Sequence, residues 1–264
     1  MSSIVPRLFE IYRAAGCEPL TGHSPYHFFN WRDAPFTRFL RGPELLGVAG
    51  LALQEIMFIE HFRDFISPRR ILIVGNAHGW STIALALIFP EAKTIAIDPD
   101  PAGVEFTNGL IAANGLPARA VVASSPGDVA KVVKEHLEDS VDFSLIDAMH
   151  HNEAIKADFD AVKAVSTGDA CHLFHDVINW NMADGFNDLL TKHQLQGRVF
   201  TRTASGMALA YSRISPEFLA YLNCFADIPG LFHKLRLMIN EAIVDPIQAY
   251  PKYDSATPQG NRRF

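Results

Sequence analysis

The sequence predicts an α/β fold in which a doubly wound, mostly parallel sheet of seven strands ends in an antiparallel hairpin. From residue 71 onward, β-branched apolar runs alternate with stretches of helical pattern, and the connections between them are short. This alternation favours parallel strands joined by right-handed crossovers, with helices on both faces of the sheet. Residues 198–212 instead hold two strand-like runs around Ala204, Ser205 and Gly206, which predicts the closing hairpin.

The alternating elements are placed by their apolar patterns. We expect strands at residues 71–74, 94–97, 119–123, 141–146 and 171–175. Helices are expected at residues 81–89, 101–114, 127–137, 152–164 and 182–193. Together with the hairpin, these elements predict one main domain at residues 67–214.

Two flanking segments complete the chain. Prolines interrupt the first forty residues, so we expect an irregular cap there, with aromatic side chains at Tyr26, Phe28, Phe29, Trp31 and Phe36. Residues 43–65 have apolar side chains near helical spacing and are followed by Ser67 and Pro68, which predicts a helix. Residues 1–66 are therefore expected to form a helical cap segment. Residues 215–264 are expected to form a C-terminal extension that is helical in parts.

The composition limits the kinds of partner. The chain has 264 residues and a formal charge of −6, and its basic residues are scattered, which argues against a nucleic-acid surface. Cys17, Cys171 and Cys224 are odd in number and widely spaced, so we expect neither a disulfide framework nor a thiolate zinc site. This cysteine usage predicts an intracellular, cytoplasmic protein. The apolar stretch 45–59 is too short to span a bilayer and contains two polar residues, so no membrane partner is expected.

A glycine-containing loop follows the first predicted strand of the main domain. The strand breaks at Gly75, the chain passes Gly79, and a helical pattern begins near Ser81. A glycine lets the backbone approach a ligand where a Cβ atom would collide. Ser81 or Thr82 can cap the helix, whose first N–H groups can face a cofactor. The loop therefore predicts a nucleotide-type cofactor site.

Polar side chains follow the other predicted strands. Ligands of open α/β sheets bind beyond the carboxyl ends of the strands, so these residues are candidates for the site. Asp98 lies about twenty residues past the loop, the position at which an acid can bind both hydroxyls of a ribose. Alternatively, Asp98 caps the helix that follows it. The remaining strand ends carry Ser124 and Ser125, Asp147, and His175 with Asp176. Ser124 and Ser125 can meet an adenine, but their segment also fits an ordinary helix start.

The glycine spacing separates two classes of nucleotide site. A nicotinamide dinucleotide site favours G-x-G-x-x-G, whereas residues 75–81 read GNAHGWS. With the strand ends, this loop resembles class I S-adenosylmethionine-dependent methyltransferases, and among them the metal-assisted small-molecule O-methyltransferase branch. The resemblance covers residues 67–212 and rests on Gly75, Gly79, Asp98, the segment IDAMH at 146–150, and His175-Asp176-Val177.

The resemblance implies a Rossmann-like fold, S-adenosylmethionine as cofactor and a small-molecule methyl acceptor. It places ten residues at the cofactor: Gly75, Asn76, Ala77, His78, Gly79, Ser81, Asp98, Ser124, Ser125 and Asp147. It also implies that Asp147 and Asp176, with His175 as a third ligand, hold a divalent metal. His150, three positions after Asp147, is implied as the base, so the expected catalytic residues are His150, His175 and Asp176.

The metal is left open by the residues themselves. Magnesium prefers oxygen ligands, whereas a mixed imidazole and carboxylate set suits manganese, iron or zinc. In a site without metal, His175 would bond to the backbone, Asp176 would cap a turn, and His150 alone would remove the acceptor's proton. Among the neighbouring polar residues, we expect His151 to start a helix and His172 to be structural. Trp180 is a candidate wall of the acceptor pocket.

Two positions depart from the family's pattern. Ile73 stands where the family has an acid, and Ala77 stands where it has the central glycine of the loop. The methionine end of the cofactor must then be held by the loop backbone, by the side chains of Asn76 and His78, or by Asp147.

We therefore predict an S-adenosylmethionine-dependent methyltransferase that acts on a small molecule, at oxygen in preference to nitrogen or sulfur. Two alternatives remain, a nicotinamide-dependent oxidoreductase and a non-catalytic S-adenosylmethionine-binding regulatory domain. A homodimer is compatible with the sequence, because aromatic clusters such as the N-terminal one also occur at dimer contacts.

Overall fold

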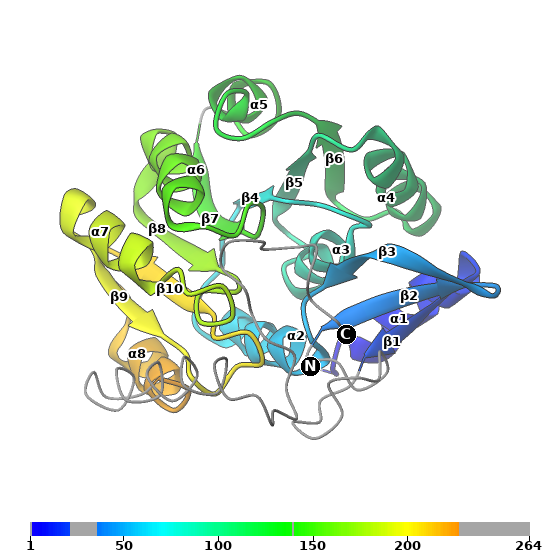
Figure 1. Ribbon diagram of the computed structural model, residues 1–264, viewed down its shortest axis with the longest axis horizontal. Coiled ribbons are helices and arrows are strands. Elements are labelled where there is room, and N and C mark those ends of the chain that lie inside the picture. The colour runs from blue at the N-terminus through cyan, green and yellow to red at the C-terminus, as the bar shows by residue number, and fades with distance from the viewer. Residues whose placement is uncertain (1, 22–35, 139, 227–264) are drawn as a thin grey trace, which may run out of the picture.

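A seven-stranded sheet forms the centre of the molecule. The computed structural model describes residues 2–21, 36–138 and 140–226. The strands lie in the order β6-β5-β4-β7-β8-β10-β9 (Figure 1). Their bounds are β4 Arg70–Val74, β5 Lys93–Asp98, β6 Ala118–Val122, β7 Val141–Ile146, β8 Ser166–Phe174, β9 Gln196–Val199 and β10 Ala208–Tyr211. β4 to β8 are parallel, and β10 is antiparallel to β8 and β9. The predicted sheet and its closing hairpin are confirmed.

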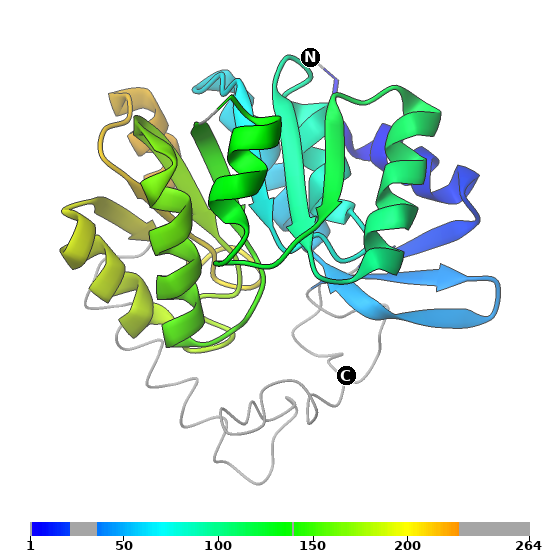
Figure 2. The same ribbon diagram turned by 90° about the horizontal axis from the view of Figure 1, so that it is seen from above.

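Helices cover both faces of this sheet, as Figure 2 shows from above. Their bounds are α3 Trp80–Ile88, α4 Pro101–Asn114, α5 Val129–His136, α6 Asn152–Ala164 and α7 Ala183–His193. In β4, Ile71 and Ile73 pack into a core shared with α3 and α4. Leu72 and Val74 pack into a second core with α5, α6 and α7. Successive residues of a strand point to opposite faces, so a strand covered on both faces needs a continuous apolar run.

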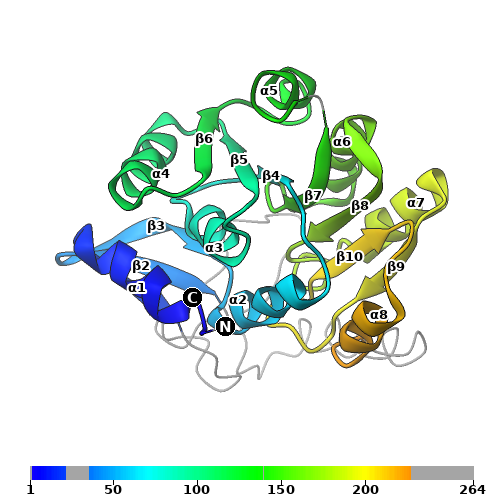
Figure 3. The same cartoon turned by 180° about the vertical axis from the view of Figure 1, so that it is seen from behind.

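The N-terminal segment is an ordered layer, and the prediction of an irregular cap is wrong for its described part. It consists of α1 Val5–Ala14 and an antiparallel sheet of β1 Cys17–Thr21, β2 Thr37–Arg41 and β3 Glu44–Gly50. α1 packs against β1 (Figure 3) and buries Leu8, Ile11 and Tyr12 in the core that contains α3. Pro19 lies in β1, an edge strand, where its missing N–H group is tolerated.

The single helix predicted for residues 43–65 is also wrong in its first part. Residues 44–50 form β3, and the helix α2 spans Leu53–Glu60 before a 3-10 turn, η2, at His61–Asp64. The apolar residues of this stretch fit either period, and pairing with β2, in which Leu45 lies opposite Leu40, makes the first part a strand.

The described part of the C-terminal extension contains one helix, α8 Pro216–Asn223. Its side chains Phe218 and Leu222 are buried in the core that contains α2 and α3, and the Phe218 ring meets the Phe62 ring edge-on at 5.0 Å. The remaining tail and the aromatic residues Tyr26, Phe28, Phe29 and Trp31 lie outside the described residues.

Two further features concern the cysteines and the length of the helices. Cys17, Cys171 and Cys224 are all free thiols. Within the described ranges, every helix is too short or too polar to cross a bilayer.

His172 is a structural residue of β8, as the sequence predicts. It is buried, and its Nδ1 atom lies 2.9 Å from the Ser144 hydroxyl of β7. Burial, together with the positive charges of Lys163 and His193, lowers the pKa of His172 to about 3. The folded protein therefore keeps this imidazole uncharged at pH values where the unfolded chain would protonate it.

This burial predicts a pH dependence of stability. Below pH 6.5 the unfolded chain takes up a proton that folded His172 refuses, so the free energy of unfolding falls as the pH falls. Between pH 6.5 and 5, the wild type should lose roughly 1 to 2 kcal/mol more than His172→Asn, which keeps an acceptor for Ser144. Urea unfolding at both pH values measures this difference, with pH 7.5 to 8.5 as the control range. Equal losses in the two proteins would contradict it.

Candidate active site

A cavity of about 580 Å³ lies at the carboxyl edge of the sheet. Its walls come from the residues that follow β4, β5, β6 and β7, and the N-terminal sheet contributes Phe39 and Gly50. Its volume is in the range of sites for small ligands. Nine of the ten residues predicted for the cofactor line it: Gly75, Asn76, Ala77, His78, Ser81, Asp98, Ser124, Ser125 and Asp147. Gly79 is not among the lining residues.

The two predicted loop glycines are required for packing within the chain. Gly75 has φ +98°, and a Cβ atom on it would lie 1.9 Å from the backbone oxygen of Asp147. Gly79 has φ +80°, and its Cβ atom would lie 2.5 Å from the hydroxyl of Thr107. Both residues therefore make room for neighbouring parts of the protein, whereas the sequence suggested room for a ligand.

Asp98 fixes the loop between these glycines. Its Oδ2 atom accepts hydrogen bonds from the backbone N–H groups of Asn76 and Ala77, at 2.9 and 2.8 Å. Its Oδ1 atom accepts from the N–H of Asp100 at 2.9 Å. Ala77 has φ +45°, a left-handed backbone conformation that non-glycine residues rarely adopt. The loop keeps its shape because the Asp98 carboxylate holds it.

The Asn76 side chain does not face the cavity as an open ligand group. Its amide donates to the Thr107 hydroxyl and to the Ala77 carbonyl, and its oxygen accepts from the Thr82 hydroxyl, all at 2.9 Å. These bonds are internal to the protein. Of the side chains expected to hold the methionine end of a cofactor, His78 and Asp147 remain.

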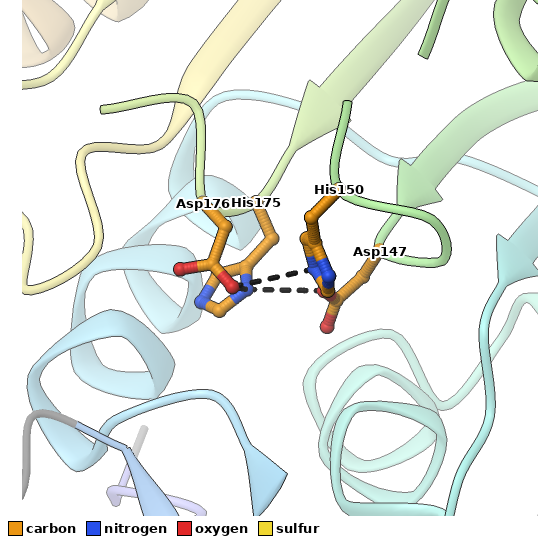
Figure 4. Close-up of side chains that lie close together, drawn as sticks. All are labelled: Asp147, His150, His175 and Asp176. Atoms are coloured by element: carbon orange, nitrogen blue, oxygen red, sulfur yellow. Dashed lines mark hydrogen bonds and ion pairs between the residues drawn. The ribbon is translucent and has the colours of Figure 1, made fainter. Parts of the chain in front are cut away.

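Four side chains beyond β7 and β8 point toward one another, as Figure 4 shows. The four are Asp147, His150, His175 and Asp176, and one ligand atom of each lies within 4.8 Å of the others. His175 Nδ1 is 3.1 Å from Asp147 Oδ1 and 3.4 Å from Asp176 Oδ2. His150 Nε2 is 3.3 Å from the same two oxygens. The structure therefore brings together every residue that the sequence predicted for catalysis and metal binding.

Opposite charges lie next to one another in this cluster and shift one another's pKa values. Burial raises the pKa of Asp147, but the charge of His175 and hydrogen bonds from both imidazoles outweigh burial and hold it well below its usual range. Burial also opposes ionisation of Asp176, and the His175 charge nevertheless lowers the pKa of Asp176 to about 2. For His175, burial lowers the pKa, whereas Asp147, Asp176 and Glu55 raise it well above its usual value. At neutral pH, His175 is an imidazolium among carboxylates.

The fifth member of the site is Glu55 of α2, which the sequence did not single out as functional. Its side chain is fully buried, and its Oε2 atom lies 2.9 Å from His175 Nε2. A signal was present, because an acid stood within an otherwise apolar stretch. Nothing in the sequence showed that residue 55 would reach a strand end 120 positions away.

Further residues border the cluster. The Trp180 indole stacks on the His150 ring at 5.2 Å with an interplanar angle of 14°. Asn179 donates from its amide to Asp176 Oδ1 at 3.1 Å. His151 starts α6 as predicted, because its ring accepts from the Ala154 N–H at 3.1 Å.

Comparison with known families identifies the fold. Residues 72–177 match the family described as a methyltransferase domain. This matched range is similar to a methyltransferase domain, and its sheet has the Rossmann-like topology that the sequence predicts. All four residues of the cluster lie inside the range of this methyltransferase domain, whereas Glu55 lies before it.

Solved structures share the fold of the methyltransferase domain. A cofactor-bound protein from MTB, Rv0187, is 20% identical over 65% of this chain and 85% of its own, with a TM-score of 0.52. An O-methyltransferase from Bacillus cereus in complex with SAH is 14% identical over 81% and 92%, with a TM-score of 0.51. The O-methyltransferase TomG from Streptomyces achromogenes, in complex with SAM, is 14% identical over 80% and 90%, with a TM-score of 0.50. A search among curated proteins gave no match.

Proposed function

We propose that the protein transfers a methyl group from S-adenosylmethionine to a hydroxyl oxygen of a small molecule. One observation carries the proposal: the cavity that begins at the loop after β4 also contains Asp147 and His150. A cofactor lying along the loop would thus bring its sulfonium end to the cluster. O-methyltransferases among the structures of similar fold support oxygen as the acceptor atom.

The residues present fit an adenosine cofactor. The Asp98 carboxylate uses three acceptor positions on backbone N–H groups, which leaves capacity for a ribose hydroxyl. Ser124 and Ser125 line the cavity beyond the next strand of the sheet, and the buried hydroxyl of Ser125 lies beside the Asp158 carboxyl group. An adenine edge at that position would meet these polar groups.

His150 is the proposed base. Its Nε2 atom faces two carboxylates, which favours a proton on that nitrogen, and its Nδ1 atom is buried and has no partner within the described ranges. Nδ1 is then the atom that takes the acceptor's proton. S-adenosylmethionine, when bound, would supply the methyl group: attack by the acceptor oxygen would break the carbon–sulfur bond and release neutral S-adenosylhomocysteine. Asp147 and Asp176 stabilise the imidazolium that forms.

The cluster also has donors suited to a divalent metal. Ligand atoms at 2.0–2.1 Å from a tetrahedral ion are about 3.4 Å apart. The four measured separations between imidazole nitrogens and carboxylate oxygens run from 3.1 to 3.4 Å. Asp147, His175 and Asp176 would hold such an ion, which would take the place of the proton on Nδ1 of His175. A bound metal would lower the pKa of an acceptor hydroxyl, and this donor set favours manganese, iron or zinc over magnesium.

Cofactor binding tests the class of reaction. Calorimetric titration of the purified protein should show binding of S-adenosylhomocysteine and no heat from NAD, because the loop lacks the dinucleotide glycine spacing. Binding of NAD without binding of S-adenosylhomocysteine would instead indicate the oxidoreductase alternative.

The base is tested by His150→Ala with His151→Ala as its matched control. Labelled S-adenosylmethionine is supplied with a panel of small phenols, sugars and hydroxy acids, and transfer of the label is measured. His150→Ala should lower the transfer rate by about 10² to 10⁴, the contribution typical of a general base, and leave S-adenosylhomocysteine binding intact. His151→Ala removes only a helix cap and should retain activity. Full activity of His150→Ala would exclude His150 as the base.

Metal content is tested on the same preparation. Elemental analysis should find manganese, iron or zinc at about one ion per chain, because three donors of the cluster are held together before any substrate binds. Asp176→Asn should lose the ion, and chelation should abolish transfer. Full activity in protein stripped of metal would show that His150 acts without an ion.

A further inference from the structure

The Glu55 carboxylate has no acceptor position left unused. Its Oε1 atom accepts from the backbone N–H of Ser205 at 2.8 Å and from the Ser205 hydroxyl. Its Oε2 atom accepts from the Ala52 N–H and lies against His175 Nε2, each at 2.9 Å. A carboxylate offers about four lone-pair positions, and here four donors occupy them. The group is therefore fixed in orientation as well as in place.

This saturation decides how the His175 ring is turned. Because the Oε2 atom can only accept, His175 Nε2 must carry a proton and donate it to Glu55. The other ring nitrogen, Nδ1, is then directed at Asp147 and Asp176, which also contact His150. Glu55 thus sets the orientation of the four-residue cluster, although His175 is the only member that it contacts.

Ser205 links Glu55 to the cluster by a second route. Its hydroxyl donates to Glu55 and accepts from the Asp176 N–H at 3.3 Å. Asp176 is a non-glycine residue at φ +60°, a conformation that persists only where neighbours hold it. The Ser205 carbonyl also accepts from the Asn179 N–H at 3.1 Å.

We infer that Glu55, with Ser205, is a positioning residue of the active site, fixing the His175 ring and the Asp176 backbone from outside the methyltransferase domain at residues 72–177. The role in turnover rests on the proposed function, whereas the orientation of His175 does not. Neither residue touches the reacting groups; they act through His175 and Asp176.

Glu55→Gln is the sharpest variant, because a glutamine is isosteric but offers an NH₂ group in place of one acceptor oxygen. That NH₂ group would face either the Ser205 donors or the His175 and Ala52 donors. Glu60→Gln is the matched control. Glu60 lies on the same helix and is also buried. Its carboxylate accepts from the N–H group of Ile4 at 2.7 Å, and Ile4 is far from the clustered residues in the sequence.

The readout is the ring nitrogen NMR spectrum of ¹⁵N-histidine-labelled protein, assigned with His175→Gln and His150→Ala. We expect the wild type to show a protected Nε2–H signal of His175. Glu55→Gln should lose or shift it, and should also shift the ring signals of His150, which Glu55 does not touch. Glu60→Gln should leave both sets unchanged. Unchanged His175 and His150 signals in folded Glu55→Gln would overturn the inference.

Two further measurements separate this inference from the proposed function. The affinity for S-adenosylhomocysteine should change less than threefold in Glu55→Gln, while label transfer to the acceptor panel should fall 10- to 100-fold. Wild-type protein that binds no S-adenosylhomocysteine would refute the proposed function and leave the NMR test standing. Wild-type rates in Glu55→Gln would refute the positioning role alone. If Glu55→Gln does not fold, Ser205→Ala replaces it, and unshifted His175 and His150 signals there would overturn the inference equally.

Discussion

The imidazolium of His175 is the charge on which the arrangement of the site depends. Three acidic side chains, Glu55, Asp147 and Asp176, meet its two ring nitrogens, and the ring itself is buried. Removing one partner from a buried ion pair typically costs 3 to about 5 kcal/mol, because the other charge is left without compensation. Each of these groups therefore constrains the others.

The topology of the sheet explains why most of this cluster could be predicted. β7 and β8 are parallel neighbours, and Ile146 lies opposite Phe174, so Asp147 and His175 follow at the same level of the carboxyl edge. A pattern of alternating strands and helices is enough to expect such neighbours. The same reasoning placed Asp98 and the two serines at the cavity. Local pattern could not predict Glu55 or Ser205, because their contacts depend on the packing of segments outside the repeating units.

The N-terminal layer shows the corresponding limit for the fold. The stretch that contains β3 and α2 has apolar residues compatible with both periods, and only pairing with β2 makes the first part a strand. The error matters for the site, because α2 begins where β3 ends and carries Glu55 inward. Ile73 and Ala77 raise a related point. Ile73 is buried in the sheet core, and the N–H group of Ala77, a residue with a left-handed backbone, is bound by Asp98.

Three separate parts of the chain contribute residues to the candidate active site. Residues 72–177 supply most of the cavity lining and the four clustered side chains, α2 supplies Glu55, and the loop between β9 and β10 supplies Ser205. Arg202 of the same loop donates to the carbonyls of Cys224 and Ala226 just beyond α8. All acceptor positions of the Glu55 carboxylate are occupied. A displacement of one of its hydrogen-bond donors is therefore transmitted to the other donors. The orientation of the clustered imidazoles is therefore coupled to the packing of α2 and of the loop between β9 and β10.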